Sequence, residues 1–216
     1  MKVSIIIPAY YIDDSYVEMT QDCVNSVKAT CKPHEIIVVD DGSPVKAEID
    51  FATNIHLEDN KGYAGAVNRG FEASTGDVTI VLNNDTLATE GWFEALTEPL
   101  NTGLPENYDI MSIRTTDCDG YNKADIITDG DKFGSCWAIK SDVFRDLGML
   151  STDFGRGYAE DLALWRDALE KGLRIGKNHN GTIFHEGKKT FKVIDPDDIY
   201  YTEALMAYKN KYGTID

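Results

Sequence analysis

Two runs of mostly β-branched residues in this chain each end in oxygen-bearing side chains. Residues 37–39 (Ile-Val-Val) lead into Asp40 and Asp41, and residues 78–82 (Val-Thr-Ile-Val-Leu) lead into residues 83–85 (Asn-Asn-Asp). Each run predicts a buried strand that delivers polar groups to the rim of a parallel sheet, where α/β proteins bind ligands. Two strands that end in this way predict one polar pocket that contains a cation.

Asp85 is a candidate ligand for that cation. Hard cations such as Mg²⁺ and Mn²⁺ prefer carboxylate and water oxygens, often completed by phosphate. The same residue types also form Asx turns, so a turn that caps the strand remains an alternative. His185, far along the chain, offers an imidazole that suits Mn²⁺, although a lone histidine is more often structural. The metal interpretation requires a fold that brings Asp85 and His185 together.

Glu160 and Asp161 are candidates for acid–base chemistry. They follow a loop rich in glycine and aromatic residues (154–158) and begin an amphipathic helical pattern. Acids at a helix N-terminus also simply offset the helix dipole, which is the alternative explanation. The dipole lowers the pKa of a carboxyl there, so a general base needs burial or a neighbouring acid to raise it again. Glu160 beside Asp161 supplies such a neighbour.

The remaining pattern must position these residues. The expected elements of the first half are strands at 3–8, 37–41, 54–57 and 78–82 and helices at 15–30, 60–70 and 89–100. This alternation predicts a parallel sheet built from βαβ units. The expected elements of the second half are strands at 110–115, 134–139, 174–177 and 182–185 and helices at 141–147, 160–170 and 196–212. The two halves predict a Rossmann-like, mostly parallel sheet flanked by helices, with a small antiparallel part in the second half.

The segment 60–70 has an unusual helical face. Gly62, Ala66 and Gly70 recur every four residues, which leaves that face nearly bare. A bare face lets the helix backbone approach either the sheet or a ligand closely. Both interpretations stay open.

Composition limits the possible partners. The 216 residues fit one large domain, and the net charge of −16 argues against nucleic acid or an anionic membrane as a partner. No signal peptide and no apolar run of about 20 residues is visible, so we expect no integral membrane segment. The four cysteines show no zinc-binding spacing, which favours reduced thiols and a cytoplasmic location.

The ordered series of motifs resembles family 2 of the inverting glycosyltransferases, which have the GT-A fold. The matching segments are residues 3–8, 38–43, 60–70 and 82–86, Glu160 to Leu162 with Arg166, and His185. The resemblance implies one GT-A domain over residues 1–216, with a nucleotide-binding half (1–100) and an acceptor and catalytic half (101–216). The asparagine-rich 83–86 segment and the His185-to-Thr190 spacing resemble rhamnosyl-transferring members. No Gln-x-x-Arg-Trp motif is present, which indicates transfer of a single sugar.

The resemblance also implies roles for individual residues. The implied nucleotide-binding residues are Pro8, Ala9, Tyr10, Asp40, Asp41, Asn60, Gly62, Asn68, Asn83 and Asn84. Asp85 and His185 would hold Mn²⁺ or Mg²⁺, although Asn83 replaces the first acid of the family's DXD motif. Asp161 would be the general base, with Glu160 beside it. Trp137 and the 154–158 loop, Tyr158 in particular, are candidates for contact with sugar or acceptor, and core packing is an equal alternative for Trp137.

The implied reaction is metal-dependent, inverting transfer from a UDP- or dTDP-sugar to a hydroxyl of a glycan or other acceptor. An alternative is a non-catalytic carbohydrate- or nucleotide-binding protein derived from such an enzyme. A nucleotidyltransferase is disfavoured because residues 8–10 (Pro-Ala-Tyr) stand where its basic phosphate loop would be. Many relatives carry further domains and membrane helices that this chain lacks, which leaves two alternatives: a minimal enzyme or one module of a larger protein.

Overall fold

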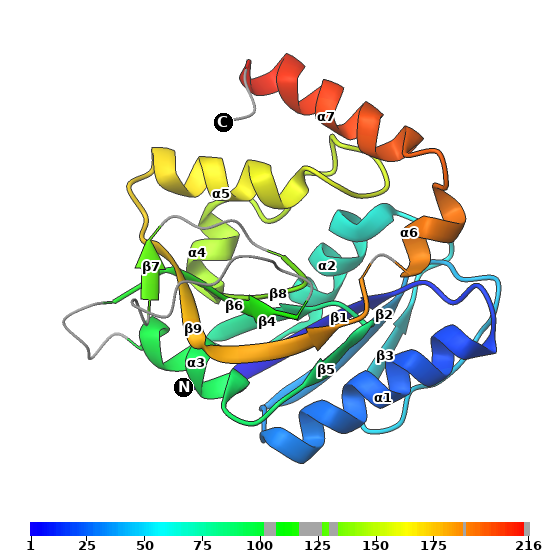
Figure 1. Cartoon of the computed structure of the whole chain (residues 1–216), viewed down its shortest axis with the longest axis horizontal. Helices are drawn as coiled ribbons and strands as arrows, with labels where there is room; N and C mark the ends of the chain where they lie inside the picture. Colours follow the sequence, from blue (N-terminus) through cyan, green and yellow to red (C-terminus); the bar gives the residue numbers. More distant parts are fainter. Residues whose placement is uncertain (102–106, 117–126, 130–133, 188, 214–216) are drawn as a thin grey trace.

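The computed structural model describes residues 1–101, 107–116, 127–129, 134–187 and 189–213. Within these residues one sheet of nine strands has helices on both faces (Figure 1). The strands are β1 (Val3–Ala9), β2 (Glu35–Asp40), β3 (Thr53–His56), β4 (Val78–Leu82), β5 (Thr86–Ala88), β6 (Ile110–Thr115), β7 (Ile127–Asp129), β8 (Cys136–Lys140) and β9 (Ile175–His185). The helices are α1 (Asp14–Thr30), α2 (Gly62–Ala73), α3 (Trp92–Thr97) continued by a 3₁₀ turn (Glu98–Leu100), α4 (Ser141–Asp146), α5 (Glu160–Glu170), α6 (Lys189–Ile194) and α7 (Ile199–Tyr212).

Strand β1 shows how the apolar runs build two cores. Every residue of this strand is buried, as expected for a central strand covered on both faces. Ile5 and Ile7 pack in the cluster that includes α1 and α3, and Ile6 packs in the cluster with α2, α4 and α5. Successive side chains point to opposite faces of the sheet, so one apolar run serves both layers.

The first half of the sheet is parallel, as predicted. Strand β1 pairs in parallel with β2 on one side and with β4 on the other, and β3 adds to β2. The strands that follow β1 in the sequence are therefore added first on one side of it (β2 and β3) and then on the other (β4), so the strand order reverses between β1 and β4. At such a switch point the loops after the strands diverge and leave a crevice at the carboxyl ends, where ligands bind. The Asp40–Asp41 and Asn83–Asp85 segments both lie at this edge.

The second half makes the sheet mixed rather than mostly parallel. Strand β8 runs antiparallel to both β4 and β6, and β5 and β7 run antiparallel to β9. One long strand, β9, replaces the two short strands expected at 174–177 and 182–185. The polar residues between them suggested a turn, but a register shift opposite Ile113 and Arg114 absorbs them as a bulge.

The predicted C-terminal helix is α7, and a short helix that was not predicted, α6, precedes it. The buried Asp195 lies between them, and its carboxylate accepts hydrogen bonds from the backbone N–H groups of Ile199 and Tyr200 at 2.7 and 3.1 Å. These bonds satisfy free donors at the start of α7. Pro196 follows directly, and a proline favours an extended conformation in the residue before it. The chain therefore breaks between α6 and α7.

Helix α2 uses its bare face for contact with the sheet. A Cβ atom on Gly70 would lie 2.5 Å from Cγ2 of Ile6 and 3.1 Å from Cγ2 of Val39. We expect Gly70→Ala to reduce the free energy of unfolding by about 1–3 kcal/mol, because overpacking a close contact forces neighbouring groups to shift. Urea unfolding followed by circular dichroism measures this change. Gly134→Ala is the control, since a Cβ there meets no atom of the described residues within 4 Å, and equal effects of the two substitutions would contradict the packing argument.

Candidate functional site

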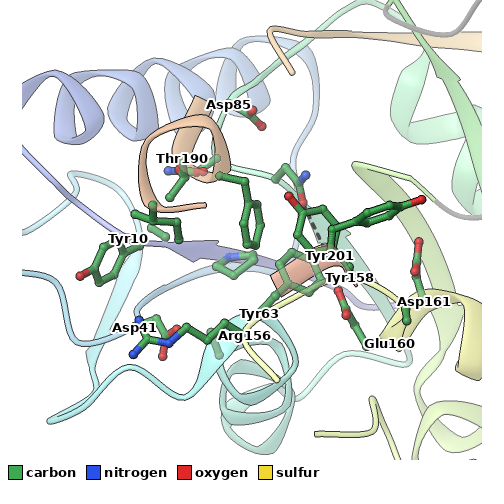
Figure 2. A pocket seen from close by; sticks show the side chains of 18 of the residues that line it. Tyr10, Asp41, Tyr63, Asp85, Arg156, Tyr158, Glu160, Asp161, Thr190 and Tyr201 are labelled. Carbon is green, nitrogen blue, oxygen red and sulfur yellow. Dashed lines mark hydrogen bonds between the residues drawn. The ribbon is translucent and has the colours of Figure 1, made fainter. Parts of the chain in front are cut away.

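A cavity of about 610 Å³ lies at the carboxyl edge of β1, β2 and β4 (Figure 2). It is bounded by the Gly-rich loop, the start of α5 and the helices α6 and α7. Its wall brings together twelve of the predicted site residues: Pro8, Ala9, Tyr10, Asp41, Asn60, Asn83, Asn84, Asp85, Tyr158, Glu160, Asp161 and His185. The other four, Asp40, Gly62, Asn68 and Trp137, lie outside this wall.

Asp85 and His185 are brought together by strand pairing. Thr86 of β5 lies opposite His185 of β9 in an antiparallel pair, which places residues 99 positions apart side by side. The Nε2 atom of His185 lies 3.1 Å from Oδ1 of Asp85, and the two side chains are only 11% and 9% exposed. The backbone N–H of Glu186 also donates to the carbonyl of Asp85 at 3.1 Å. A carboxylate and an imidazole that share one cavity wall fit a Mn²⁺-type cation.

Asp41 forms another part of the wall. Its Oδ1 accepts the backbone N–H of Lys61 at 2.6 Å, which fixes the carboxylate at the start of α2. Burial raises the pKa of Asp41 to about 6, although hydrogen bonds from Lys61 and Gly62 and the charge of Arg156 oppose this shift. A buried acceptor of this kind suits a planar N–H donor on a ligand.

Arg156 is a wall residue that the sequence did not single out, although it belongs to the 154–158 loop proposed for sugar contact. It comes from the loop that precedes α5, and Figure 2 shows it close to Asp41. Its backbone carbonyl accepts the N–H of Tyr63 at 2.9 Å, and a Cβ on Gly62 would lie 2.8 Å from its Cα. Gly62 has φ +76°, a conformation that glycine adopts without strain. Gly62 therefore positions Arg156 through the backbone, which is why it lies outside the wall itself.

Glu160 and Asp161 occupy the first turn of α5. Figure 2 shows them on the opposite side of the view from Asp41 and Arg156. Glu160 is 6% exposed, and Asp161 is half-buried. Burial, with a smaller contribution from the charge of Asp161, raises the pKa of Glu160 from its ordinary 4.5 to about 8. Glu160 is therefore mostly neutral at pH 7, so the pair carries less than two negative charges.

The raised pKa of Glu160 predicts a dependence of stability on pH. Between about pH 4.5 and pH 8 the folded protein keeps a proton on Glu160 that the unfolded chain has released, so stability falls as pH rises across this window. The loss is complete above about pH 8. We expect Glu160→Gln to remove this loss. The free energy of unfolding of the variant minus that of the wild type should therefore increase by up to a few kcal/mol from pH 5 to pH 8. Urea unfolding at both pH values measures the difference, and the exposed Glu170→Gln on the same helix is the control.

Three predicted nucleotide-binding residues lie outside the cavity wall and make contacts that hold the fold. Asp40 accepts the N–H of Ser43 at 2.8 Å and contacts Nδ1 of His56 at 2.9 Å, so it fixes its own loop. Asn68 exchanges hydrogen bonds with both backbone groups of Leu150, at 2.8 and 3.0 Å. Gly62 acts through the Arg156 backbone. A sequence pattern cannot separate these roles, because a residue that stabilises a loop and a residue that binds a ligand both occur at regular motif positions.

Trp137 belongs to the core. It is 1% exposed and packs edge-on against Phe144, with ring centroids 5.8 Å apart. It therefore takes the core role that the sequence left open, and it makes no direct contact with the cavity. Tyr158 does line the cavity, where its ring lies 4.5 Å from that of Phe191 and 5.2 Å from that of Tyr201.

Helices α6 and α7 contribute an apolar wall that the sequence did not assign. Its residues are Thr190, Phe191, Ile194, Tyr201 and Leu205. Aromatic residues recur along the last helical segment, and their high frequency was the feature of the sequence that could have indicated this wall. The pattern shows no polar group that marks the segment as part of a site, so pattern reasoning treats it as packing.

Cysteine and membrane features add little to the site. Cys23, Cys31 and Cys136 are free thiols, and Cys118 lies outside the described residues. In the part of the chain that the structure describes, no helix combines the length and apolar character that crossing a bilayer requires.

The sequence matches one family model. Residues 4–148 match the model described as "Glycosyl transferase family 2". A curated relative, the glucosyl-dolichyl phosphate glucuronosyltransferase of Haloferax volcanii, is 26% identical over 183 residues, which cover 72% of this chain and 58% of the relative. The chain thus spans little more than half the length of this relative.

Solved structures show the same fold. GalNAc-T7 with UDP, GalNAc and Mn²⁺ superposes with a TM-score of 0.72 at 16% identity, over 86% of this chain and 44% of that one. Residues 1–349 of TarS from S. aureus, in complex with UDP-GlcNAc, superpose with a TM-score of 0.68 at 16% identity, over 97% and 67%. The predicted α/β architecture of GT-A type is confirmed.

Proposed function

Because the chain belongs to glycosyl transferase family 2, we propose that it transfers a single sugar from a UDP- or dTDP-sugar to a hydroxyl of a glycan or other acceptor, with inversion. One observation carries the proposal. A single cavity at the switch point of the sheet contains Asp41, the Asp85–His185 pair and the Glu160–Asp161 pair. Together these groups supply what the reaction needs: a nucleotide-base contact, ligands for a cation and a carboxylate base.

Asp41 and Arg156 would bind the nucleotide. The buried carboxylate of Asp41 would accept the N–H of a uracil or thymine ring, and the guanidinium of Arg156 is a cation that suits a phosphate. The chain has a net charge of −16, so binding an anionic donor requires local positive charge. Arg156 and a metal ion would provide it.

Asp85 and His185 would hold Mn²⁺ or Mg²⁺. Among the described residues no group of three His, Cys, Asp or Glu side chains could hold a metal, so these two ligands would be completed by phosphate oxygens of the donor and by water. When bound, the metal offsets the negative charge that develops on the departing diphosphate.

Asp161 would act as the general base. An acceptor hydroxyl attacks the anomeric carbon, its proton passes to the Asp161 carboxylate, and the bond from that carbon to the diphosphate oxygen breaks with its electron pair. Direct displacement needs only one carboxylate, unlike glycoside hydrolysis with two. A neutral Glu160 beside Asp161 leaves a single negative charge at this end of the cavity, which limits repulsion of the anionic donor.

The aromatic wall would receive the acceptor. Tyr158 and Tyr201 face the cavity near the acid pair in Figure 2, and aromatic rings provide apolar faces for sugar binding. Two of the structurally similar proteins were solved with UDP, GalNAc and Mn²⁺ and with UDP-GlcNAc. They support a UDP-sugar as donor and a divalent metal as cofactor. The proposal covers transfer of either a hexosyl or a rhamnosyl group. It also includes a role for the chain as a module of a larger glycosyltransferase.

Thermal-shift screening tests the proposal. UDP, dTDP and GDP are each added with and without Mn²⁺, and a ligand at 100 times its dissociation constant adds about 2.7 kcal/mol of stability. We expect a shift with UDP or dTDP that increases with Mn²⁺. Turnover of the matching nucleotide sugar then separates a transferase from a non-catalytic binding protein. No shift with any nucleotide would contradict the proposed function.

A further inference from the structure

His56, the last residue of β3, contacts two carboxylates at once. It lies opposite Asp40 in the parallel pair of β2 and β3, and its Nδ1 atom is 2.9 Å from Oδ2 of Asp40. Its Nε2 atom is 3.0 Å from Oε1 of Glu48, which belongs to the segment between these strands. A neutral imidazole has one N–H and can donate to only one carboxylate, whereas the imidazolium donates to both. The geometry is therefore that of a charged His56.

Asp40 connects this histidine to the nucleotide side of the cavity. The Oδ1 atom of Asp40 accepts the backbone N–H of Ser43 at 2.8 Å. The hydroxyl of Ser43 in turn accepts the backbone N–H of Tyr11, just after β1, at 2.7 Å. Asp41, the proposed contact for the nucleotide base, is the residue next to Asp40. The carboxylate of Asp40 thus joins the two strand ends that form this side of the wall.

The charge of Asp40 needs a partner, because the residue is only 2% exposed and an unpaired buried carboxylate is unstable. Lys46 shares Oδ2 with His56, at 3.2 Å, but its side chain is 57% exposed against 32% for His56. Burial raises the pKa of Asp40, but hydrogen bonds from His56 and Ser43 bring it below its ordinary value. Tyr11 does not titrate in the neutral range, because burial raises the pKa of its hydroxyl. His56 is therefore the more buried of the two cations that compensate Asp40.

We propose that His56 is a positioning residue for nucleotide binding and that its charge makes donor affinity depend on pH. The charged ring holds Asp40 and Glu48 together and keeps the segment that carries Asp41 in place. When the ring loses a proton, the remaining N–H stays on the side of the buried Asp40. The other nitrogen is then an acceptor that faces the Glu48 oxygen, so this contact opens and the charge of Asp40 loses a compensating cation. The inference rests on the proposed function and deepens it by assigning a regulation to the base-binding side of the cavity.

A ligand-free measurement tests the charged state. The ring signals of His56 are followed by NMR as a function of pH. The hydrogen bond to Asp40, followed by that to Glu48, raises the pKa of His56, so we expect a midpoint above the ordinary 6.5 and a lower midpoint in Glu48→Gln. His34, an exposed histidine that contacts the Thr75 hydroxyl at 3.2 Å, is the reference in the same spectra. A midpoint for His56 at or below 6.5 would overturn the charged state.

Calorimetry tests the role of this charge in binding. The dissociation constant for UDP with Mg²⁺ is measured at about pH 6 and about pH 9. His56→Gln keeps one N–H donor, like neutral histidine, but carries no charge. We expect it to raise the dissociation constant about three- to tenfold at the lower pH, and less than twofold at the higher pH, where the wild-type ring is neutral too. His34→Gln is the matched control and should change neither value.

The ratio of the two dissociation constants separates the hypotheses, because ionisation of UDP affects both proteins equally. A purely structural role for His56 would give the same ratio at both pH values, and this result would overturn the positioning role. If the wild type binds no nucleotide at either pH, the proposed function fails and the role of His56 toward a donor fails with it. If UDP binds and the ratio is constant, only the further inference fails.

Discussion

Replacement of Asp161 by Asn is expected to abolish sugar transfer while donor binding persists. The amide cannot take the proton of the acceptor hydroxyl, and loss of a general base typically costs 10²–10⁴-fold in rate. Asp161 lies at the acid end of the cavity, so the substitution should leave the proposed contacts of Asp41 and Asp85 with the nucleotide unchanged. We therefore expect kcat to fall by about that factor, with a dissociation constant for UDP within about twofold of the wild type.

Asp167→Asn provides the control for Asp161→Asn. It makes the same chemical change six residues along α5, at a side chain that bonds Tyr212 rather than lining this cavity. It should keep wild-type transfer. The assignment of Asp161 as base is wrong if Asp161→Asn transfers sugar at the wild-type rate while it still binds nucleotide.

Replacement of Asp85 by Asn is expected to remove both metal-dependent binding and transfer. The substitution removes the anionic ligand and leaves His185 as the only predicted protein ligand for the cation. Loss of preorganised charge at a developing anion typically costs about 10²–10³-fold in kcat. We expect a loss of this size, and we expect the thermal shift with UDP to become independent of Mn²⁺.

Asp22→Asn is the control for Asp85→Asn. It makes the same chemical change at an exposed residue of α1 that lies outside the cavity wall. Removal of metal from the wild type with EDTA should reproduce the Asp85→Asn phenotype. Full activity of the EDTA-treated wild type, or a Mn²⁺-dependent shift that survives in Asp85→Asn, would contradict the metal assignment.

The local pattern was sufficient to place most of the first half. Strand runs that end in acids, such as the one that leads to Asp41, show both the element and the edge where it ends. The metal hypothesis required Asp85 to approach His185, but no local pattern predicts this approach, since it depends on the pairing of β5 with β9. A pairing between residues 95 to 99 positions apart leaves no periodic signal in either segment.

Residues with two possible roles limited the prediction of the site. Trp137 and Asn68 have chemistry suited to ligand contact, but the fold places one in the core and the other against Leu150. The place of Arg156 beside Asp41, and the wall from α6 and α7, were not predicted for the opposite reason. Their positions depend on how the Gly-rich loop packs against Gly62 and Phe191, and a tertiary contact of this kind is not encoded in local spacing.

The most direct test of the central hypothesis is ¹H NMR of donor cleavage in real time. The protein is incubated with Mn²⁺ and the α-linked UDP- or dTDP-sugar whose nucleotide gives the thermal shift, with water as the acceptor. Inverting displacement at this cavity predicts that free sugar appears first as the β anomer, and that Asp161→Asn suppresses its release. Initial release of the α anomer, or equal release by Asp161→Asn, would contradict the assignment of this cavity to an inverting transferase.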